Sequence, residues 1–166
     1  GPGEGVTAGA LTRVREAAPR DAGRLARLRY DFRAAEDPAV EGREAFLERC
    51  EPWMRERLAA GRERWRCWVA EPDGVVRGHV WVQLVPKVPN PADEAEAHAY
   101  LTNMYVEPAH RGGGLGTALM RRAVEWCRER GVDSLILWPT EDSRSLYRRF
   151  GCAPSEGLFE LDVGAD

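Results

Sequence analysis

Four of the five positions from 112 to 116 are glycine, Leu115 being the exception, and an amphipathic segment follows them directly. Successive backbone N–H groups at the start of a helix bind anions, because the helix dipole places partial positive charge there. Glycine lets a phosphate approach the backbone without an intervening Cβ and tolerates positive φ. Arg111 adds a side-chain charge at the entrance to the loop. The segment predicts a site for a phosphate-bearing ligand, with a glycine turn that binds nothing as the alternative.

Two common phosphate-binding motifs do not account for this loop. A P-loop ends in Gly-Lys-Ser/Thr, and no lysine is present in this stretch. The dinucleotide-binding fingerprint requires a further glycine at the position of Thr117 and an early place in a βαβ unit. Neither an ATP-type nor an NAD-type site is therefore expected.

A second motif lies downstream, where residues 146–152 read LYRRFGC. Upstream, Arg111-x-x-Gly114-x-Gly116 follows a strand-like segment that ends at Pro108, and this arrangement resembles the acyl-CoA-binding motif of the GNAT superfamily of N-acetyltransferases. The downstream motif resembles the Leu-Tyr-x-x-x-Gly-Phe signature of that family. The resemblance extends from Leu11 onward, and it implies a GNAT fold with acetyl-CoA as the acyl donor and no metal.

The resemblance assigns roles to residues of both motifs. It implies that the loop amides and the Thr117 hydroxyl bind the pyrophosphate of CoA, and that the end of the preceding strand pairs with pantetheine. A backbone N–H near Asn103 or Met104 would donate to the thioester oxygen. The residues expected to bind acetyl-CoA are Met104, Tyr105, Val106, Arg111, Gly112, Gly113, Gly114, Leu115, Gly116 and Thr117.

Tyr147 matches the family tyrosine that protonates the departing thiolate. A phenol has a reference pKa of ~10, close enough to the ~8.5 of a thiol for proton donation. The alternative is a tyrosine that only packs on the core. Cys127 and Cys152 lie on apolar faces, so a cysteine nucleophile is not expected.

The general base and the acceptor are less well defined. Residues 101–103 read Leu-Thr-Asn, where polyamine-type family members have Leu-Glu-Asp, so the base is left to water or to an acid elsewhere, such as the loop containing Asp93, Glu94 and Glu96. The acids between Asp31 and Glu41 form either a solvated charge run or an anionic rim for an amine. His79 is interpreted as a sheet residue, with a base as the alternative. The residues expected to contact the acceptor are Tyr30, Thr102 and Asn103.

The elements that position these motifs follow from periodicity. Alternating or continuous apolar runs predict strands at 11–16, 65–71, 76–85, 100–106, 134–138 and 157–163, of which 134–138 is expected to be central and buried and 157–163 to close the sheet. Helices are predicted after Asp21, at 43–60 with a kink or break at Pro52, at 117–130 and at 143–150. Asp21 is expected to cap the first of these, because its side chain can accept hydrogen bonds from the freed backbone N–H groups. The order predicts an α/β fold with a mixed, mostly antiparallel sheet flanked by helices.

Composition limits the remaining choices. The chain has 166 residues, 24 basic against 27 acidic, and a net charge of -3. That balance argues against a nucleic-acid partner, and no apolar run is long enough to span a membrane. The four cysteines lack zinc-type spacing and predict reduced thiols in a cytoplasmic protein. We interpret residues 1–10 as a tag remnant or tail and 11–166 as one domain, and a homodimer is left open.

The sequence thus predicts an N-acetyltransferase that moves an acetyl group from acetyl-CoA to a primary amine of a small molecule, by direct attack in a ternary complex. Two alternatives remain. One is an acyltransferase of the same fold that acts on a protein or uses a longer acyl-CoA. The other is a non-catalytic acyl-CoA-binding module, which would not require Tyr147.

Overall fold

The computed structural model describes residues 13–38, 41–60 and 62–164, so the predicted tail at 1–10 lies outside the described residues. A single open sheet contains the strands β1 (Val14–Glu16), β2 (Trp65–Ala70), β3 (Gly78–Pro86), β4 (Ala97–Val106) and β5 (Leu135–Ile136), in that order. Pairing is antiparallel from β1 to β4 and parallel between β4 and β5. The mixed, mostly antiparallel sheet is confirmed.

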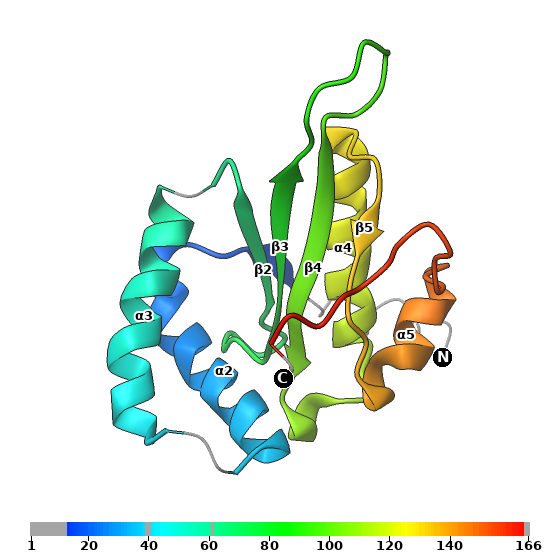
Figure 1. Cartoon of the computed structure of the whole chain (residues 1–166). Helices are drawn as coiled ribbons and strands as arrows, with labels where there is room; N and C mark the ends of the chain where they lie inside the picture. Colours follow the sequence, from blue (N-terminus) through cyan, green and yellow to red (C-terminus); the bar gives the residue numbers. More distant parts are fainter. Residues whose placement is uncertain (1–12, 39–40, 61, 165–166) are drawn as a thin grey trace.

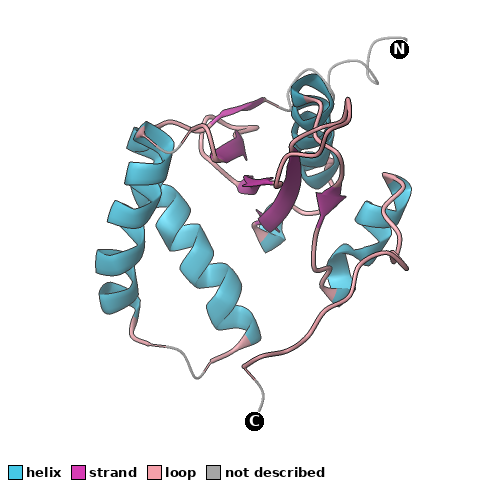
Figure 2. Cartoon of the chain, turned by 45° about the horizontal axis from the view of Figure 1, so that its top comes forward, coloured by secondary structure: helices cyan, strands magenta, loops and turns pink. Residues whose placement is uncertain are grey.

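Helices cover both faces of this sheet (Figures 1 and 2). The helices α2 (Ala22–Glu36) and α3 (Arg43–Ala59) lie against one face, and α4 (Leu115–Arg130) lies against the other. The short helix α5 (Arg144–Arg149) lies beyond β5. Three 3-10 turns precede α2, α4 and α5, at Pro19–Asp21, Pro108–His110 and Glu141–Ser143.

Two apolar clusters fill the space on either side of the sheet. Because successive side chains of a strand point to opposite faces, Trp68 and Val80 pack toward α4, whereas Val69 and Trp81 pack toward α2 and α3. Burial on both faces explains why β2 and β3 read as continuous apolar runs.

Two predictions about the helices are corrected. The helix α3 continues through Pro52 without a break. Asp21 was expected to cap α2, but its side chain makes no cap hydrogen bond to that helix. Instead its carboxylate accepts hydrogen bonds from the backbone N–H of Ala18 at 2.8 Å and from the Arg15 guanidinium at 2.9 Å. Asp21 therefore links the 3-10 turn to β1.

The predicted strands at 134–138 and 157–163 are also corrected. The first is reduced to Leu135–Ile136, which is half-buried at the sheet edge, and Pro139 soon follows, where a missing N–H cannot continue a ladder. Residues 157–163 form no strand and run across the outside of the molecule (red in Figure 1). The strand β5 has only two paired residues, so it provides no hydrogen-bond ladder that residues 157–163 could extend. The side chains of this segment are accordingly unburied, and Phe159 is 95% exposed.

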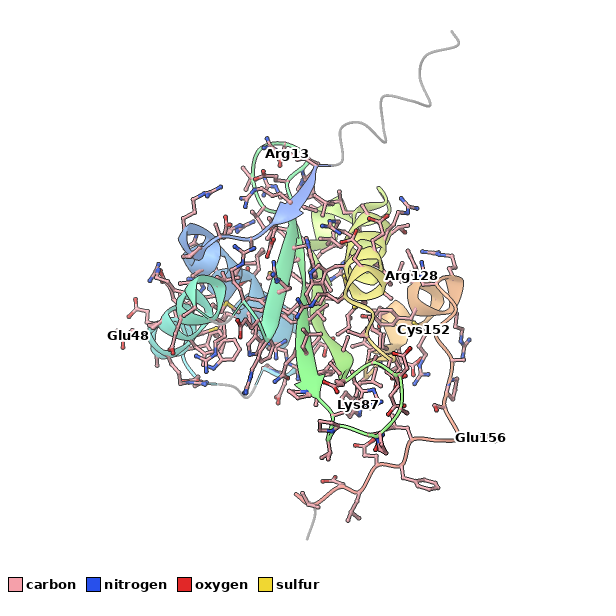
Figure 3. The ribbon with its side chains drawn as sticks, turned by 90° about the horizontal axis from the view of Figure 1, so that it is seen from above. Arg13, Glu48, Lys87, Arg128, Cys152 and Glu156 are labelled. Atoms are coloured by element: carbon pink, nitrogen blue, oxygen red, sulfur yellow. The ribbon has the colours of Figure 1, made fainter. Side chains whose placement is uncertain are left out.

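The loop between β3 and β4 lies at the end of the sheet opposite the glycine loop (Figure 1). Its Lys87 pairs with Asp133 at 3.0 Å and with Glu94 at 3.7 Å. Figure 3 shows Lys87 on this loop. The loop thus carries Asp93, Glu94 and Glu96 away from the glycine loop.

Candidate active site

The strand β4 contains a bulge near its middle. His79 faces Tyr105 in the β3–β4 register and Trp81 faces Thr102, so Asn103 and Met104 together oppose one residue of β3. Asn103 has φ 55°, a left-handed conformation that asparagine tolerates better than most residues. The bulge redirects the end of β4 toward the glycine loop.

The strands β4 and β5 diverge immediately before this bulge. They pair only at Ala99 with Leu135 and at Tyr100 with Ile136. The remainder of β4, from 101 to 106, has no partner on its β5 side. A gap therefore opens in the sheet beside the residues that were predicted to bind pantetheine.

This gap forms part of a cleft of about 720 Å³, here called the glycine-loop cleft. All of the predicted acetyl-CoA residues line it except Gly113. The other lining residues are Phe32, Ala35, Glu36, Pro108, His110, Thr140, Asp142, Ser143, Ser145, Leu146 and Arg149. They come from α2, from the 3-10 turn after β4 and from the α5 region, which the motifs alone did not identify.

The glycines of the loop have the conformation that the predicted site requires. Gly112 and Gly114 have φ 84° and 87°, and α4 begins at Leu115 directly after them. A Cβ at either glycine would meet no heavy atom within 4 Å, so both positions face open space. Their backbone and the amino end of α4 can therefore approach a bound phosphate closely.

Arg111 is held at the edge of the cleft by two contacts. Its Nε donates to the carbonyl oxygen of Val106 at 2.9 Å, and its guanidinium lies 5.6 Å from the centre of the Tyr105 ring. Arg149 of α5 lines the opposite wall. These two cations offer charge to a phosphate-bearing ligand, as predicted for Arg111.

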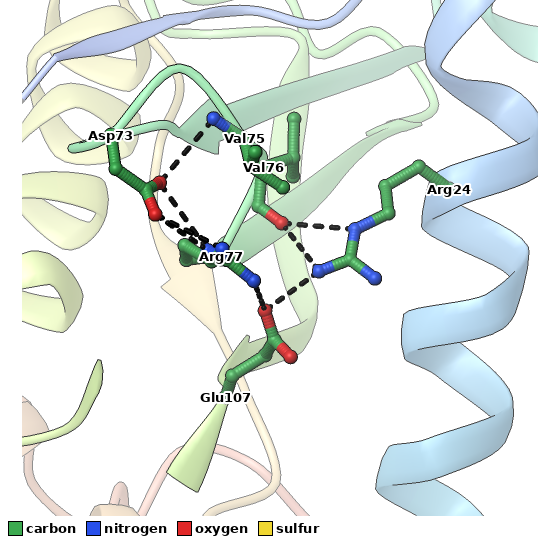
Figure 4. A network of polar contacts seen from close by, with 6 residues as sticks. All are labelled: Arg24, Asp73, Val75, Val76, Arg77 and Glu107. Carbon is green, nitrogen blue, oxygen red and sulfur yellow. Dashed lines mark hydrogen bonds and ion pairs between the residues drawn. The ribbon is translucent and has the colours of Figure 1, made fainter. Parts of the chain in front are cut away.

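A polar network fixes the end of β4 just before the loop (Figure 4). The Arg24 guanidinium of α2 donates to Glu107 at 2.6 Å and to the carbonyl oxygen of Val76 at 2.9 Å. Arg77 donates to the same carboxylate oxygen at 3.2 Å and pairs with Asp73 at 3.0 Å. The network joins α2, the β2–β3 turn and the start of the phosphate-binding segment.

Tyr147 lies on α5 but is buried in the core cluster against α4, and it does not line the glycine-loop cleft. Burial raises the pKa of its phenol to about 12, an effect that a hydrogen bond with Ser143 opposes. Ser143 itself lines the cleft. Ser143 therefore separates the phenol from the cleft. The pKa of the phenol also differs more from that of a thiol than the phenol reference value of ~10 does.

A second cavity of about 370 Å³, here called the aromatic pocket, lies on the α2 and α3 face of the sheet. Of the three residues expected to contact the acceptor, Thr102 and Asn103 line this pocket, whereas Tyr30 lies outside it and packs against Phe46 with ring centres 5.8 Å apart. Two neighbouring residues of the bulge border the two cavities, since Asn103 lines the aromatic pocket and Met104 lines the glycine-loop cleft. Its lining residues are Arg29, Phe46, Arg49, Cys50, Trp53, Met54, Trp65, Trp81, Tyr100, Thr102 and Asn103.

The acids considered as bases do not reach this pocket. None of the described residues that line it is Asp, Glu or His. Glu41 pairs with Arg49, Glu36 pairs with Arg33 at 3.2 Å, and Asp31 is exposed. The anionic rim considered for residues 31–41 is therefore not formed in the pocket.

Arg29 is among the pocket residues that were not predicted from the sequence. Its Nη1 donates to the side-chain oxygen of Asn103 at 3.1 Å, and its guanidinium lies 5.8 Å from the Phe32 ring centre. The signal was present, because position 29 falls four residues after Leu25 and three before Phe32, on the apolar stripe of α2. A charged side chain on an apolar stripe indicates that the helix faces a cavity or a polar partner at that position.

The remaining candidates are structural. His79 is fully buried, and desolvation lowers its pKa to about 4, so it is a poor base at neutral pH. Burial raises the pKa of Cys127 to about 11 and also raises that of Cys152, which disfavours a thiolate nucleophile. Within the described ranges, no group of three or more His, Cys, Asp or Glu is placed to hold a metal ion. No helix among the same residues is long and apolar enough to cross a membrane.

Comparisons with known proteins agree with this geometry. A glucosamine 6-phosphate N-acetyltransferase of Trypanosoma brucei brucei is 29% identical over 93 residues, which are 56% of this chain and 61% of that protein. The crystal structure of a GCN5-related N-acetyltransferase from Ralstonia eutropha JMP134 matches with 28% identity and a TM-score of 0.73, over 93% of this chain and 99% of that one. A ribosomal-protein-alanine N-acetyltransferase of Brucella melitensis biovar Abortus 2308 shares the fold at 22% identity and a TM-score of 0.65, over 90% and 98% of the two chains.

The matched lengths differ between these comparisons. The chain spans between 14% and 61% of the lengths of four curated relatives that it matches. The model of the acetyltransferase (GNAT) family, by contrast, matches residues 30–152, which include the bulge, the glycine loop and α5. On this evidence the chain belongs to the GNAT family of acetyltransferases.

Proposed function

We propose that this protein is an acetyl-CoA-dependent N-acetyltransferase whose acceptor is a primary amine of a small molecule. The amine nitrogen attacks the thioester carbon directly, with both substrates bound together. A C–N bond forms, the C–S bond breaks, the amine loses a proton and the departing thiolate gains one. The observation that carries the proposal is that the β4 bulge borders both cavities, with Met104 lining the glycine-loop cleft and Asn103 lining the aromatic pocket.

The cleft residues suit the phosphate end and the chain of CoA. The loop from Gly112 to Gly116 and the start of α4 would bind the pyrophosphate, with Arg111 and Arg149 supplying positive charge. The free side of β4 beside the bulge would pair with the pantetheine amides as an added strand does. Acetyl-CoA supplies the activated acyl group.

Tyr147 is our proposed proton donor to the thiolate. Its raised pKa keeps the phenol protonated at neutral pH, and its neighbour Ser143 lines the cleft. Because no carboxylate or histidine lines the described part of the aromatic pocket, water accepts the amine proton. A base from the segments 31–41 or 93–96 is not part of the proposal.

The other acceptor class is a protein, as the name of the Brucella relative indicates for that enzyme. We favour a small molecule because the aromatic pocket holds only about 370 Å³, near the lower end of the range for small-molecule sites. A non-catalytic acyl-CoA-binding module is the second alternative, and it gives no role to the aromatic pocket at the bulge.

The test is an assay of free CoA thiol with the purified protein, acetyl-CoA and a panel of small amines and amino-terminal peptides. Mass spectrometry of the products identifies the acetylated amine. We expect turnover with small amines and weak turnover with peptides. Acetyl-CoA binding without transfer to any member of the panel would instead support the binding-module alternative.

A further inference from the structure

The charge of the aromatic pocket is carried by one arginine that lacks an anionic partner. Arg49 also lines the pocket, but it is neutralised by Glu41. Arg29 is half-buried, and among the described residues it makes no ion pair; its polar contact is with the neutral side chain of Asn103. The pocket is therefore locally positive where it meets the bulge.

A half-buried guanidinium without a counter-ion is unfavourable, because part of its hydration is lost and no anion compensates for that loss. Burial and the neighbouring charge of Arg33 both lower the pKa of Arg29, as expected for a cation in an unfavourable environment. A ligand carboxylate would relieve this cost, since the planar guanidinium binds carboxylates through two parallel hydrogen bonds.

The rest of the pocket wall is aromatic. Trp53 and Trp65 pack edge to face with ring centres 5.3 Å apart, and Trp81 lies 6.1 Å from both. Phe46 and Tyr100 complete this wall. Such a surface binds an apolar or aromatic group, and among the described residues that line the pocket none is a carboxylate that could pair with a second positive charge.

We propose that the acceptor is an α-amino carboxylate with an apolar or aromatic side chain, held by its carboxylate at Arg29 and by its side chain against the aromatic wall. This inference rests on the proposed N-acetyltransferase function. The separation of the groups supports it, because Arg29 lies within 3.1 Å of Asn103, at the bulge where the thioester is expected. The carboxylate and the reacting amine must therefore be close together, as they are across one α-carbon.

The experiment compares acceptors that share an amine and a ring but differ in the carboxylate. L-Phenylalanine, L-phenylalaninamide and phenethylamine are each assayed with the full chain and acetyl-CoA, and glucosamine 6-phosphate is included as a phosphate-bearing amine. We expect L-phenylalanine to have a kcat/KM at least about tenfold above that of the other three. The loss of charged hydrogen bonds in the two carboxylate-free analogues accounts for this difference.

Two variants test the assignment to Arg29. Arg29→Met keeps the length of the side chain and removes its charge, so KM for L-phenylalanine should rise about ten- to a hundredfold while KM for phenethylamine changes little. Arg27→Met is the matched control, because Arg27 lies on the same helix, is exposed and lines neither cavity. Circular dichroism and thermal melting verify that both variants fold.

A second readout separates this inference from the proposed function. Quenching of tryptophan fluorescence by L-phenylalanine measures binding to the pocket without acetyl transfer. If L-phenylalanine binds in an Arg29-dependent manner but no amine is acetylated, the pocket binds an α-amino carboxylate as inferred, whereas the proposed function fails and the acceptor role fails with it. If amines are acetylated with equal efficiency with and without a carboxylate, or if glucosamine 6-phosphate is preferred, the function stands and the inference is overturned. L-Phenylalanine that is neither bound nor acetylated also overturns it.

Discussion

The Nδ1 atom of His79 lies 2.8 Å from the carbonyl oxygen of Asn103, and this contact joins β3 to the bulge of β4. The carbonyl accepts, so Nδ1 carries the proton. The other ring nitrogen, Nε2, is buried and has no hydrogen-bond partner among the described residues. A doubly protonated ring would leave a buried N–H without an acceptor, which explains why the neutral form is favoured beside the bulge.

The burial of His79 predicts a loss of stability in mild acid. Desolvation, with smaller contributions from Arg29 and Arg24, lowers the pKa of His79 from 6.5 to about 4, while the Asn103 contact opposes the shift. The unfolded chain therefore takes up a proton below about pH 6.5 that the folded protein resists down to about pH 4. The free energy of unfolding should fall by up to about 3 kcal/mol as the pH drops through this window.

Denaturant unfolding between pH 7 and pH 4 measures this dependence. His79→Gln keeps a donor for the Asn103 carbonyl and cannot gain the proton, so its unfolding free energy should depend less on pH. His98→Gln removes a histidine distant from the bulge and should retain the wild-type slope. Identical slopes for all three proteins would mean that His79 does not resist protonation in the folded state.

Gly114→Ala should weaken acetyl-CoA binding at least tenfold, because its Cβ would enter the open space of the glycine-loop cleft. The φ of 87° also strains any L-residue there, at a cost of about 1–2 kcal/mol. Gly74→Ala is the control, since Gly74 has φ 80°, faces open space and lies in a hairpin turn outside the cleft. Calorimetry with acetyl-CoA should separate the two variants, and equal affinity for both would exclude this loop as the phosphate site.

Tyr147→Phe should reduce turnover by ~10²–10⁴, the usual contribution of a general acid, which corresponds to roughly 2.7–5.5 kcal/mol of barrier. Acetyl-CoA affinity should change by less than about tenfold, because the hydroxyl acts mainly in the transition state. Rates and affinities measured with one working acceptor distinguish the outcomes. Unchanged turnover would make Tyr147 a packing residue, in keeping with its burial behind Ser143, and would transfer the acid role to water.

Glu107→Ala should destabilise the fold by about 1 kcal/mol, because it removes two partly exposed ion pairs, each of modest strength. Its partners Arg24 and Arg77 would lose the carboxylate that holds α2 and the β2–β3 turn against the end of β4. Thermal unfolding is the measurement, with Glu51→Ala as the control because its pair with Arg55 lies within one exposed helix. A melting temperature no lower than that of the control would show that the network adds nothing beyond a surface ion pair.

Spermidine should be a poor acceptor, with a KM well above that of a zwitterionic amine. The aromatic pocket contains Thr102 and Asn103 where polyamine-type family members carry acids, and Arg29 repels a polycation. Competition between spermidine and L-phenylalanine in one assay provides the comparison. Thr102→Glu should improve spermidine use, and efficient use by the wild-type protein would show that other acids bind the polycation.

Local chemistry made several features predictable from the sequence. The glycines at 112, 114 and 116 and the helix after them lie within one short segment, so their spacing alone indicated an anion site at a helix start. The apolar stripe of α4 and the apolar runs of β2 and β3 likewise arise from residues close together in the chain, so they could be predicted from the sequence. Family resemblance then identified the ligand as CoA, although Gly113 does not line the cleft.

Contacts between distant segments decided the remainder. The short pairing of β5, the unpaired segment at 157–163 and the burial of Tyr147 depend on how far β5 diverges from β4, which periodicity does not encode. The aromatic pocket combines Arg29 of α2 and Trp53 of α3 with Trp81 of β3. In the sequence, each of these side chains is indistinguishable from an ordinary helix or core residue. The charge and shape of the cavity arise only when tertiary packing brings these segments together.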